Sequence, residues 1–123
     1  MAAVADEGAV LIADAEALSR IKTIVMFMEA RFKVYEAVDT DEAIQLLALR
    51  RDIGIMLVDD ELPGSITGIE LARYAAEHFG RLRVLMTSSR RRVASALLPD
   101  GALFLDRPYH IDRVMEKLKP MSA

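Results

Sequence analysis

The sequence predicts an α/β fold of three layers, in which helices cover both faces of a five-stranded parallel sheet. Short apolar runs alternate with segments of helical periodicity five times along the chain, and no repeat, low-complexity tract or long Pro/Gly/Ser linker interrupts them. Strict alternation favours parallel strands joined by right-handed crossovers, a doubly wound arrangement. A length of 123 residues is usual for one domain, so we expect a single domain over residues 1–123, with its core between about 9 and 119.

The first half of the chain, up to the third strand, predicts two strands and two helices. An apolar run at 9–13 predicts the first strand, and a more polar run at 34–38 predicts a second strand near an edge of the sheet. Asp39, with Glu42 three residues later, resembles a capping box that opens a helix through Leu49. Between the two strands, apolar residues spaced by three and four fall on one helical stripe, namely Leu18, Ile21, Val25, Met28 and Phe32.

The third strand, at 53–59, is the most informative element. It is apolar up to its last residue, Asp59, which is followed at once by Asp60 and Glu61. An unbroken run of this kind predicts a strand that is covered on both faces. The carboxylates then cluster at its carboxyl end, where open α/β sheets place their sites.

The second half of the chain shows the same alternation of predicted strands and helices. Strands are predicted at 82–87 and 102–105, with a Pro99-Asp100-Gly101 turn before the last strand. Val93 and Leu97 indicate a short fourth helix between them. The third and fifth helices are predicted by two apolar stripes, one of Ile69, Ala72, Ala76 and Phe79, the other of Ile111, Val114, Met115 and Leu118.

Composition and charge exclude several classes of protein. A net charge of -3 and a pI near 5.4 argue against a nucleic-acid-binding domain, which normally carries a basic face. The absence of cysteine excludes disulfides, thiolate zinc sites and cysteine nucleophiles. The first residues carry Asp6 and Glu7 and no long apolar stretch, so neither a signal peptide nor a membrane span is expected, and the cytoplasm is the expected location.

Four polar residues lie at or just beyond the ends of predicted strands one, three, four and five: Asp14, Asp59, Thr87 and Arg107. Because parallel strands end at one edge of a sheet, these side chains can converge on one crevice. Oxygen ligands suit Mg²⁺, and a cation can balance the charge of a phosphate. The sequence therefore predicts a site for a divalent cation and a phosphoryl group.

Several motifs at these strand ends carry a resemblance to a known family. They are VLIADAEAL at strand one, IMLVDDELPG at strand three, GIEL in the next helix, VLMTSS at strand four and GALFLDRPY at strand five. With them the chain resembles the CheY-like receiver domain of response regulators, the phospho-accepting domain of two-component signalling, from about residue 9 to 118. The resemblance implies a flavodoxin-like (βα)5 sandwich with strand order 2-1-3-4-5.

The resemblance also implies a role for each site residue. Asp59 would attack a phosphohistidine and hold the resulting acyl phosphate, and Thr87 would hydrogen-bond a phosphoryl oxygen. Phe104 matches the aromatic residue that changes rotamer when this threonine moves. The peptide bond between Arg107 and Pro108 matches one that is usually cis in the family. Such a domain is not an enzyme for another substrate, but it assists its own phosphorylation and dephosphorylation.

Mg²⁺ is the cofactor that the resemblance implies, and one departure from the family affects it. The ligands would be Asp14, Asp59 and the backbone carbonyl of Glu61. The family normally has two adjacent acids after strand one, whereas Ala15 follows Asp14 here. Mg²⁺ typically takes only one or two protein carboxylates, so the loss of one should weaken its binding. Glu16 is the nearest substitute.

The second departure is Arg107, which stands where the family has a lysine. It replaces a compact ammonium with a planar guanidinium that is always charged. Asp14 and Asp59 repel each other when they lie close together, unless a cation lies between them. We expect Arg107 to pair with Asp59 in the metal-free state, and this pair should slow the formation of the acyl phosphate.

The implied function is that of a stand-alone receiver, which takes its phosphoryl group from a histidine kinase or a histidine phosphotransfer protein. Its output would be a conformational change at the surface of the fourth helix, fifth strand and last helix, where a downstream protein or a second copy would bind. Arg90, Arg91 and Arg92 lie near the start of the expected fourth helix, where the helix dipole disfavours cations. They are either a contact for an acidic partner or a solvated charge run.

Two other interpretations stay open. Ala15 and Arg107 also fit a degenerate receiver, which keeps the fold as a protein-interaction module that no longer depends on phosphorylation. An enzyme on the same architecture, either a flavin-binding electron carrier or an aspartate-nucleophile phosphatase, is poorly supported. The carrier needs a phosphate-cradling loop after strand one and the phosphatase needs Asp-x-Asp there, whereas the chain has Asp14-Ala15-Glu16.

Overall fold

The computed structural model describes residues 8–88 and 98–118. The strands are β1 (Ala9–Ala13), β2 (Val34–Ala37), β3 (Ile53–Asp59), β4 (Arg83–Thr87) and β5 (Leu103–Phe104). The helices within these residues are α2 (Ala17–Glu29), α3 (Thr40–Leu49), α4 (Gly68–His78) and α5 (Ile111–Leu118). The strands form one parallel sheet in the order β2-β1-β3-β4-β5. The predicted fold class and strand order are therefore confirmed.

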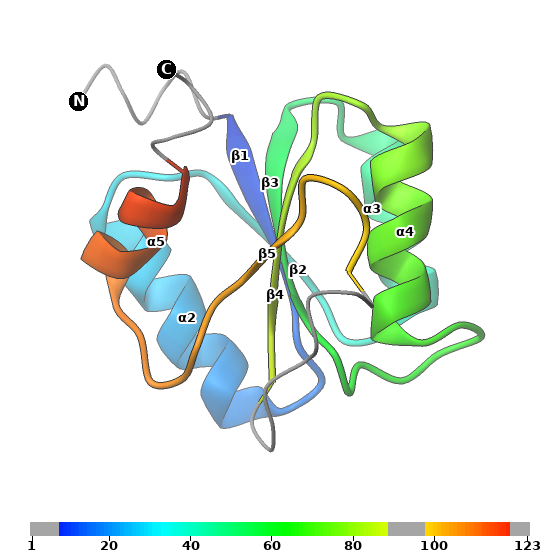
Figure 1. The fold of residues 1–123 in the computed structure, drawn as a ribbon. Coiled ribbons are helices and arrows are strands. Elements are labelled where there is room, and N and C mark those ends of the chain that lie inside the picture. Colours follow the sequence, from blue (N-terminus) through cyan, green and yellow to red (C-terminus); the bar gives the residue numbers. More distant parts are fainter. Residues whose placement is uncertain (1–7, 89–97, 119–123) are drawn as a thin grey trace.

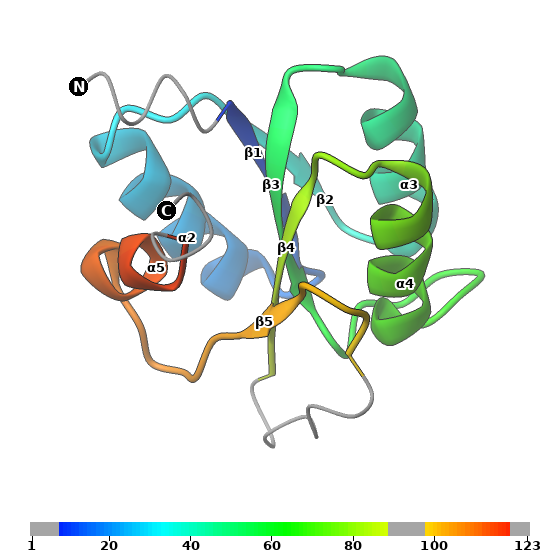
Figure 2. The same cartoon turned by 45° about the horizontal axis from the view of Figure 1, so that its top comes forward.

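The molecule has three layers, with α2 and α5 on one face of the sheet and α3 and α4 on the other (Figure 1). The tilted view keeps the same pairs of helices together on either side (Figure 2). Two separate cores result, because side chains of a strand point alternately to opposite faces. In β1, Leu11 and Ala13 face the core under α3 and α4, whereas Val10 and Ile12 face the core under α2 and α5. This alternation explains why the inner strands are apolar along most of their length.

Short-range hydrogen bonds set where the helices begin. The predicted cap of α3 is present, because Asp39 Oδ1 accepts from the amide of Glu42 at 2.7 Å. A capping box also opens α4, where the side chain of Thr67 and that of Glu70 bond each other's backbone amides. Glu16 caps α2 in the same way, with its carboxylate accepting from two amides of the first turn. Each cap satisfies backbone donors that have no partner inside the helix.

The apolar stripe of α2 faces solvent. Leu18, Ile21, Val25 and Met28 are 60%, 54%, 47% and 59% exposed, and α2 ends at Glu29, before the last predicted member of the stripe, Phe32. An apolar stripe on a helix normally faces the core, but the buried face of α2 instead carries Thr23 and Phe27. Spacing alone identifies a helix without saying which of its faces meets the sheet.

Strand boundaries differ from the prediction mainly at β5. The fifth strand was expected at 102–105, but only Leu103 and Phe104 pair as a strand, with Leu85 and Met86 of β4. The turn before the strand explains its late start, because the amide of Ala102 is already bonded to the carbonyl of Pro99, 3.1 Å away. β2 ends at Ala37 and β4 begins at Arg83, each one residue inside the predicted limit. Val93 and Leu97 lie outside the described residues.

No helix in the described ranges, 8–88 and 98–118, is long and apolar enough to cross a membrane.

Gly68, the first residue of α4, allows this helix to lie close to the loop after β3. A Cβ atom at this position would lie 2.6 Å from the carbonyl oxygen of Asp59 and 3.0 Å from Cα of Asp60. Both are backbone atoms, so a side chain here would push α4 away from the acidic residues at the end of β3.

We expect Gly68→Ala to lower the free energy of unfolding by about 1–3 kcal/mol, the usual cost of an added carbon in a closely packed position. Urea unfolding followed by circular dichroism measures this loss. Gly80→Ala is the matched control, since among the described residues no atom lies within 4 Å of its added Cβ. Equal stability of the two variants would contradict the close approach inferred for α4.

Candidate functional site

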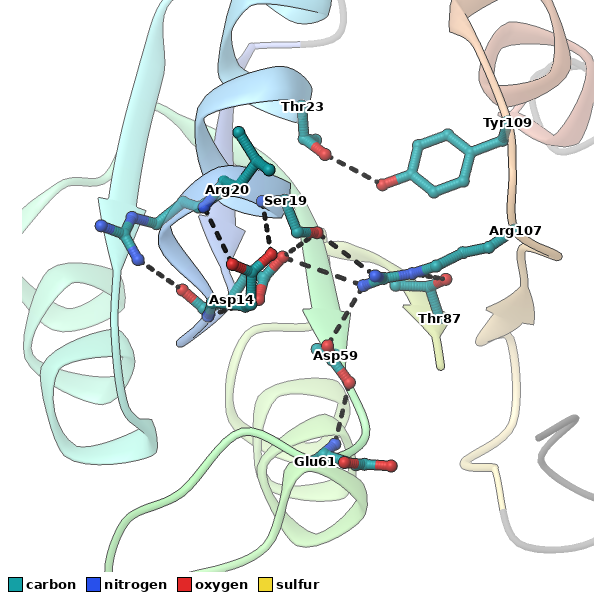
Figure 3. Close-up of polar contacts among 11 residues, drawn as sticks. Asp14, Ser19, Arg20, Thr23, Asp59, Glu61, Thr87, Arg107 and Tyr109 are labelled. Atoms are coloured by element: carbon teal, nitrogen blue, oxygen red, sulfur yellow. Dashed lines mark hydrogen bonds and ion pairs between the residues drawn. The ribbon is translucent and has the colours of Figure 1, made fainter. Parts of the chain in front are cut away.

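Four polar side chains meet at the carboxyl end of the sheet, where the strand pattern predicts them (Figure 3). Asp59 ends β3 and is in register with Thr87, the last residue of β4. Asp14 follows β1 directly, and Arg107 lies in the segment between β5 and α5. The two aspartates and the threonine are buried. Their electrostatic interactions are therefore less screened by solvent than those of a surface group.

Arg107 holds the site together, because it donates hydrogen bonds from all three guanidinium nitrogens. Nε donates to Thr87 Oγ1 at 3.1 Å, and Nη2 donates to Asp59 Oδ2 at 3.1 Å. Nη1 donates to Ser19 Oγ at 3.2 Å, and Nη2 also lies 3.8 Å from Asp14 Oδ2. The ion pair expected between Arg107 and Asp59 is therefore present. A lysine has a single nitrogen and could not make this set of contacts in the same geometry.

Asp59 is a buried carboxylate with a perturbed proton affinity. Burial raises its pKa above the usual value for an aspartate, and the nearby carboxylates of Asp14 and Asp60 act in the same direction. The amide of Glu61, which donates to Asp59 Oδ1 at 3.0 Å, and the guanidinium of Arg107 lower the pKa without cancelling the effect of burial. Ionised Asp59 is thus held in place by two donors, one on each oxygen.

Ser19 also belongs to the site, although the sequence alone does not predict this. It lies in the first turn of α2, where its hydroxyl donates to Asp14 Oδ2 at 2.6 Å and accepts from Arg107 Nη1. A hydroxyl in a first helical turn usually bonds the local backbone, so its position carries no sign of a longer-range role. Only the fold reveals that this turn packs beside the segment after β5.

The ligand atoms available in this arrangement do not fit a hydrated Mg²⁺ ion. The side chain of Ala15 supplies no ligand atom, and Glu16 is engaged in capping α2, where its oxygens accept from the amides of Ser19 at 2.7 Å and Leu18 at 3.1 Å. These bonds also lower the pKa of Glu16. The arrangement therefore does not support the predicted Mg²⁺ site of Asp14, Asp59 and the Glu61 carbonyl.

The other predicted site residues are less directly involved. Phe104 is half-buried in β5, where it packs against the core under α3 and α4. The amide of Glu61 bonds Asp59, as described above. The bond between Arg107 and Pro108 is cis, as the resemblance implied. Arg90, Arg91 and Arg92 lie outside the described residues.

An open hollow of about 470 Å³ lies beside Arg107, between the start of α2 and the segment that follows β5. Its polar lining includes Ser19, Lys22 and Thr23 from the helix, together with Arg107 and Tyr109 from the segment. The hydroxyls of Thr23 and Tyr109 lie 3.2 Å apart, in hydrogen-bonding distance (Figure 3). Burial raises the pKa of Tyr109. Leu18, one of the exposed residues of α2, also lines this hollow.

Comparison with known proteins agrees with this fold. A putative two-component response regulator of Arabidopsis thaliana, ARR21, is 30% identical to the chain over 87 residues. The structure of a probable two-component system response regulator/GGDEF domain protein superposes with a TM-score of 0.80 at 29% identity and covers 95% of the chain. The chain belongs to the response-regulator receiver family. A CheY-like receiver domain from Methanospirillum hungatei has the same fold, with a TM-score of 0.78 at 19% identity.

The extent of these matches limits what they say about a whole regulator. The match to ARR21 covers 69% of this chain but 14% of the plant protein, and the GGDEF protein is covered to 51%. The receiver domain from Methanospirillum hungatei is covered to 92%, and the match includes 93% of this chain. No protein-family model matches the chain. The shared part is thus the receiver, whose relatives act in two-component signalling.

The raised pKa of Asp59 predicts a pH-dependent effect of replacing it. Because the folded pKa lies above the unfolded value, ionised Asp59 opposes folding, and its cost appears as the pH rises through the folded pKa. We therefore expect Asp59→Asn to raise the thermal unfolding midpoint at neutral pH by a few degrees, and we expect the gain to shrink as the pH falls through the folded pKa and to vanish below the unfolded pKa. Scanning calorimetry at several pH values measures this difference.

Asp100→Asn, at an exposed turn position, is the control and should show no comparable gain. A gain for Asp59→Asn that is the same in acid as at neutral pH would show that desolvation of the carboxylate is not its cause.

Proposed function

We propose that the chain is a receiver that accepts a phosphoryl group on Asp59 from a histidine kinase or a histidine phosphotransfer protein. The observation that carries this proposal is the placement of a buried carboxylate 3.1 Å from a guanidinium nitrogen, with a threonine hydroxyl bonded to the same guanidinium. A nucleophile, a cation and a hydroxyl are thus assembled at one strand end.

The chemistry is the transfer of a phosphoryl group between two nucleophiles. A carboxylate oxygen of Asp59 attacks the phosphorus of phosphohistidine, and the P–N bond breaks. The leaving imidazole nitrogen keeps the bonding electrons and takes up a proton from water. Arg107 would stabilise the charge on the phosphoryl oxygens, because a guanidinium can donate two parallel hydrogen bonds to them. Thr87 would donate its hydroxyl to a phosphoryl oxygen once Arg107 turns toward the new group.

The donor would approach over α2 and the segment after β5. The hollow beside Arg107 opens on this side, and the solvent-exposed stripe of Leu18, Ile21, Val25 and Met28 begins at its edge. An exposed apolar strip next to a polar hollow is typical of a surface that binds another protein. A phosphotransfer partner docked on the stripe would present its imidazole to Asp59.

The output would be the conformational change implied by the family resemblance. Thr87 and Phe104 would form the switch. The surface made by β5, α5 and the helix expected around Val93 and Leu97 would carry the change to a downstream protein or to a second copy of the chain. In this proposal, Arg90, Arg91 and Arg92 contact an acidic partner on that surface, and the receiver works in the cytoplasm as a single domain.

A degenerate receiver is the alternative, and the contacts of Arg107 favour it. If the guanidinium holds Asp59 too firmly for any donor to react, the domain would act as an interaction module alone. Ala15→Asp combined with Arg107→Lys separates the two functions. A large gain in labelling would indicate degeneration, whereas no gain would indicate a working site of altered design.

The acceptor role predicts stoichiometric labelling by a small phosphoryl donor. Incubation with acetyl phosphate should add one phosphoryl group to the chain, and hydroxylamine should remove it, as expected of an acyl phosphate. Intact-mass spectrometry detects both events. Asp59→Asn should abolish the gain in mass, and Asp100→Asn should keep it. Labelling that survives in Asp59→Asn would contradict the assignment, and no labelling of either protein would favour the degenerate receiver.

A further inference from the structure

We propose that the guanidinium of Arg107 is the resident cation of the Asp14–Asp59 pocket and takes the place of a divalent metal there. The pocket would then bind no Mg²⁺ at physiological concentrations. This first part rests on geometry alone. The second part, that phosphorylation of Asp59 is independent of divalent metals, rests on the proposed function.

The guanidinium of Arg107 lies close to both carboxylates of the pocket, where a positive charge is needed. Its Nη2 atom is 3.1 Å from Asp59 Oδ2 and 3.8 Å from Asp14 Oδ2, so one cationic group faces both carboxylates (Figure 3). The side chain of Arg107 is only 23% exposed, which strengthens its attraction to both acids relative to a surface pair. The positive charge of Arg107 thereby offsets the repulsion between the two buried carboxylates.

The carboxylate oxygens that a metal would use already accept hydrogen bonds from the protein. Asp14 Oδ1 accepts from the amide of Glu16 at 2.9 Å, and Asp14 Oδ2 accepts from the hydroxyl of Ser19 at 2.6 Å. Asp59 Oδ1 accepts from the amide of Glu61, and Asp59 Oδ2 accepts from Arg107. A metal would have to share each oxygen with a donor that is already bound, and two of these donors are backbone amides that cannot turn away independently.

The volume between these side chains also argues against a bound Mg²⁺ ion. The gap lined by Asp14, Asp59, Thr87 and Arg107 has no room for a water-sized sphere among the described residues. Mg²⁺ requires octahedral coordination and usually keeps several of its waters. A hydrated ion could enter only if Arg107 left the pocket.

Three anchors hold Arg107 in place. Thr87 on β4, Ser19 on α2 and Asp59 on β3 each bond a different guanidinium nitrogen. Because the three elements are parts of the packed fold, the guanidinium of Arg107 is held in position before any ligand binds. Arg107 and Ala15 are complementary departures from the family: one adds a permanent cation, and the other removes the acid that would recruit a metal.

The first experiment is a titration of the unphosphorylated protein with Mg²⁺, followed by the thermal unfolding midpoint and by calorimetry. Ligands that bind only the folded state raise the midpoint. We expect no rise and no binding heat for the wild-type protein at millimolar Mg²⁺. Ala15→Asp combined with Arg107→Lys should acquire a midpoint that rises with Mg²⁺, whereas Ala15→Asp alone should not, because the guanidinium remains.

Circular dichroism verifies that each variant folds, and Arg113→Lys, on the exposed side of α5, controls for the exchange of an arginine elsewhere. Binding of Mg²⁺ to the wild-type protein would overturn the inference whether or not any variant folds. This test needs no phosphorylation, so its outcome is separate from that of the proposed function.

The second experiment compares labelling of Asp59 by acetyl phosphate in EDTA and in Mg²⁺. We expect the same rate in both, with loss of labelling in EDTA only for the double variant. Labelling of the wild-type protein that requires Mg²⁺ would overturn the inference. Labelling in neither condition would count against the proposed function, while the Mg²⁺ titration would still decide whether Arg107 is the resident cation.

Discussion

The electrostatic balance between two buried carboxylates and one guanidinium is the constraint on which the site depends. Adjacent β1 and β3 bring Asp14 and Asp59 to the same edge of the sheet, and their charges repel at short range unless a cation lies close to both. Arg107 meets this requirement from the segment after β5. It does so only because Thr87 and Ser19 hold its remaining nitrogens. Thus the charge distribution of the pocket is determined jointly by four segments that are distant in sequence.

The arrangement of the sheet explains why much of this site is predictable from sequence. Apolar runs identify strands that are buried on both faces, and the polar residue at the end of each run then lies at the carboxyl edge. Asp59, Thr87 and Asp14 were located in this way. Arg107 was also located, and its charge led to the expected pair with Asp59. These inferences succeed because they depend on strand order and periodicity, which the pattern of the chain contains.

Other features depend on packing that no local pattern encodes. Ser19 and Glu16 are ordinary residues for the start of a helix, yet one bonds Asp14 and the other is unavailable as a metal ligand because it caps α2. The stripe of α2 has the period of a buried face but lies in solvent, since Thr23 and Phe27 meet the sheet instead. In each case, the direction in which α2 faces decides the outcome. Its first turn connects the charged pocket to the exposed apolar stripe.

The shortness of β5 has a consequence for association. A strand at the edge of a sheet leaves backbone amides and carbonyls unpaired, which makes long edges templates for the addition of a further strand. With only Leu103 and Phe104 in the strand, this edge offers too few free groups for continuous backbone pairing with a neighbouring molecule. A partner on this side would have to recognise side chains, and this edge of the sheet is protected from the addition of a further strand.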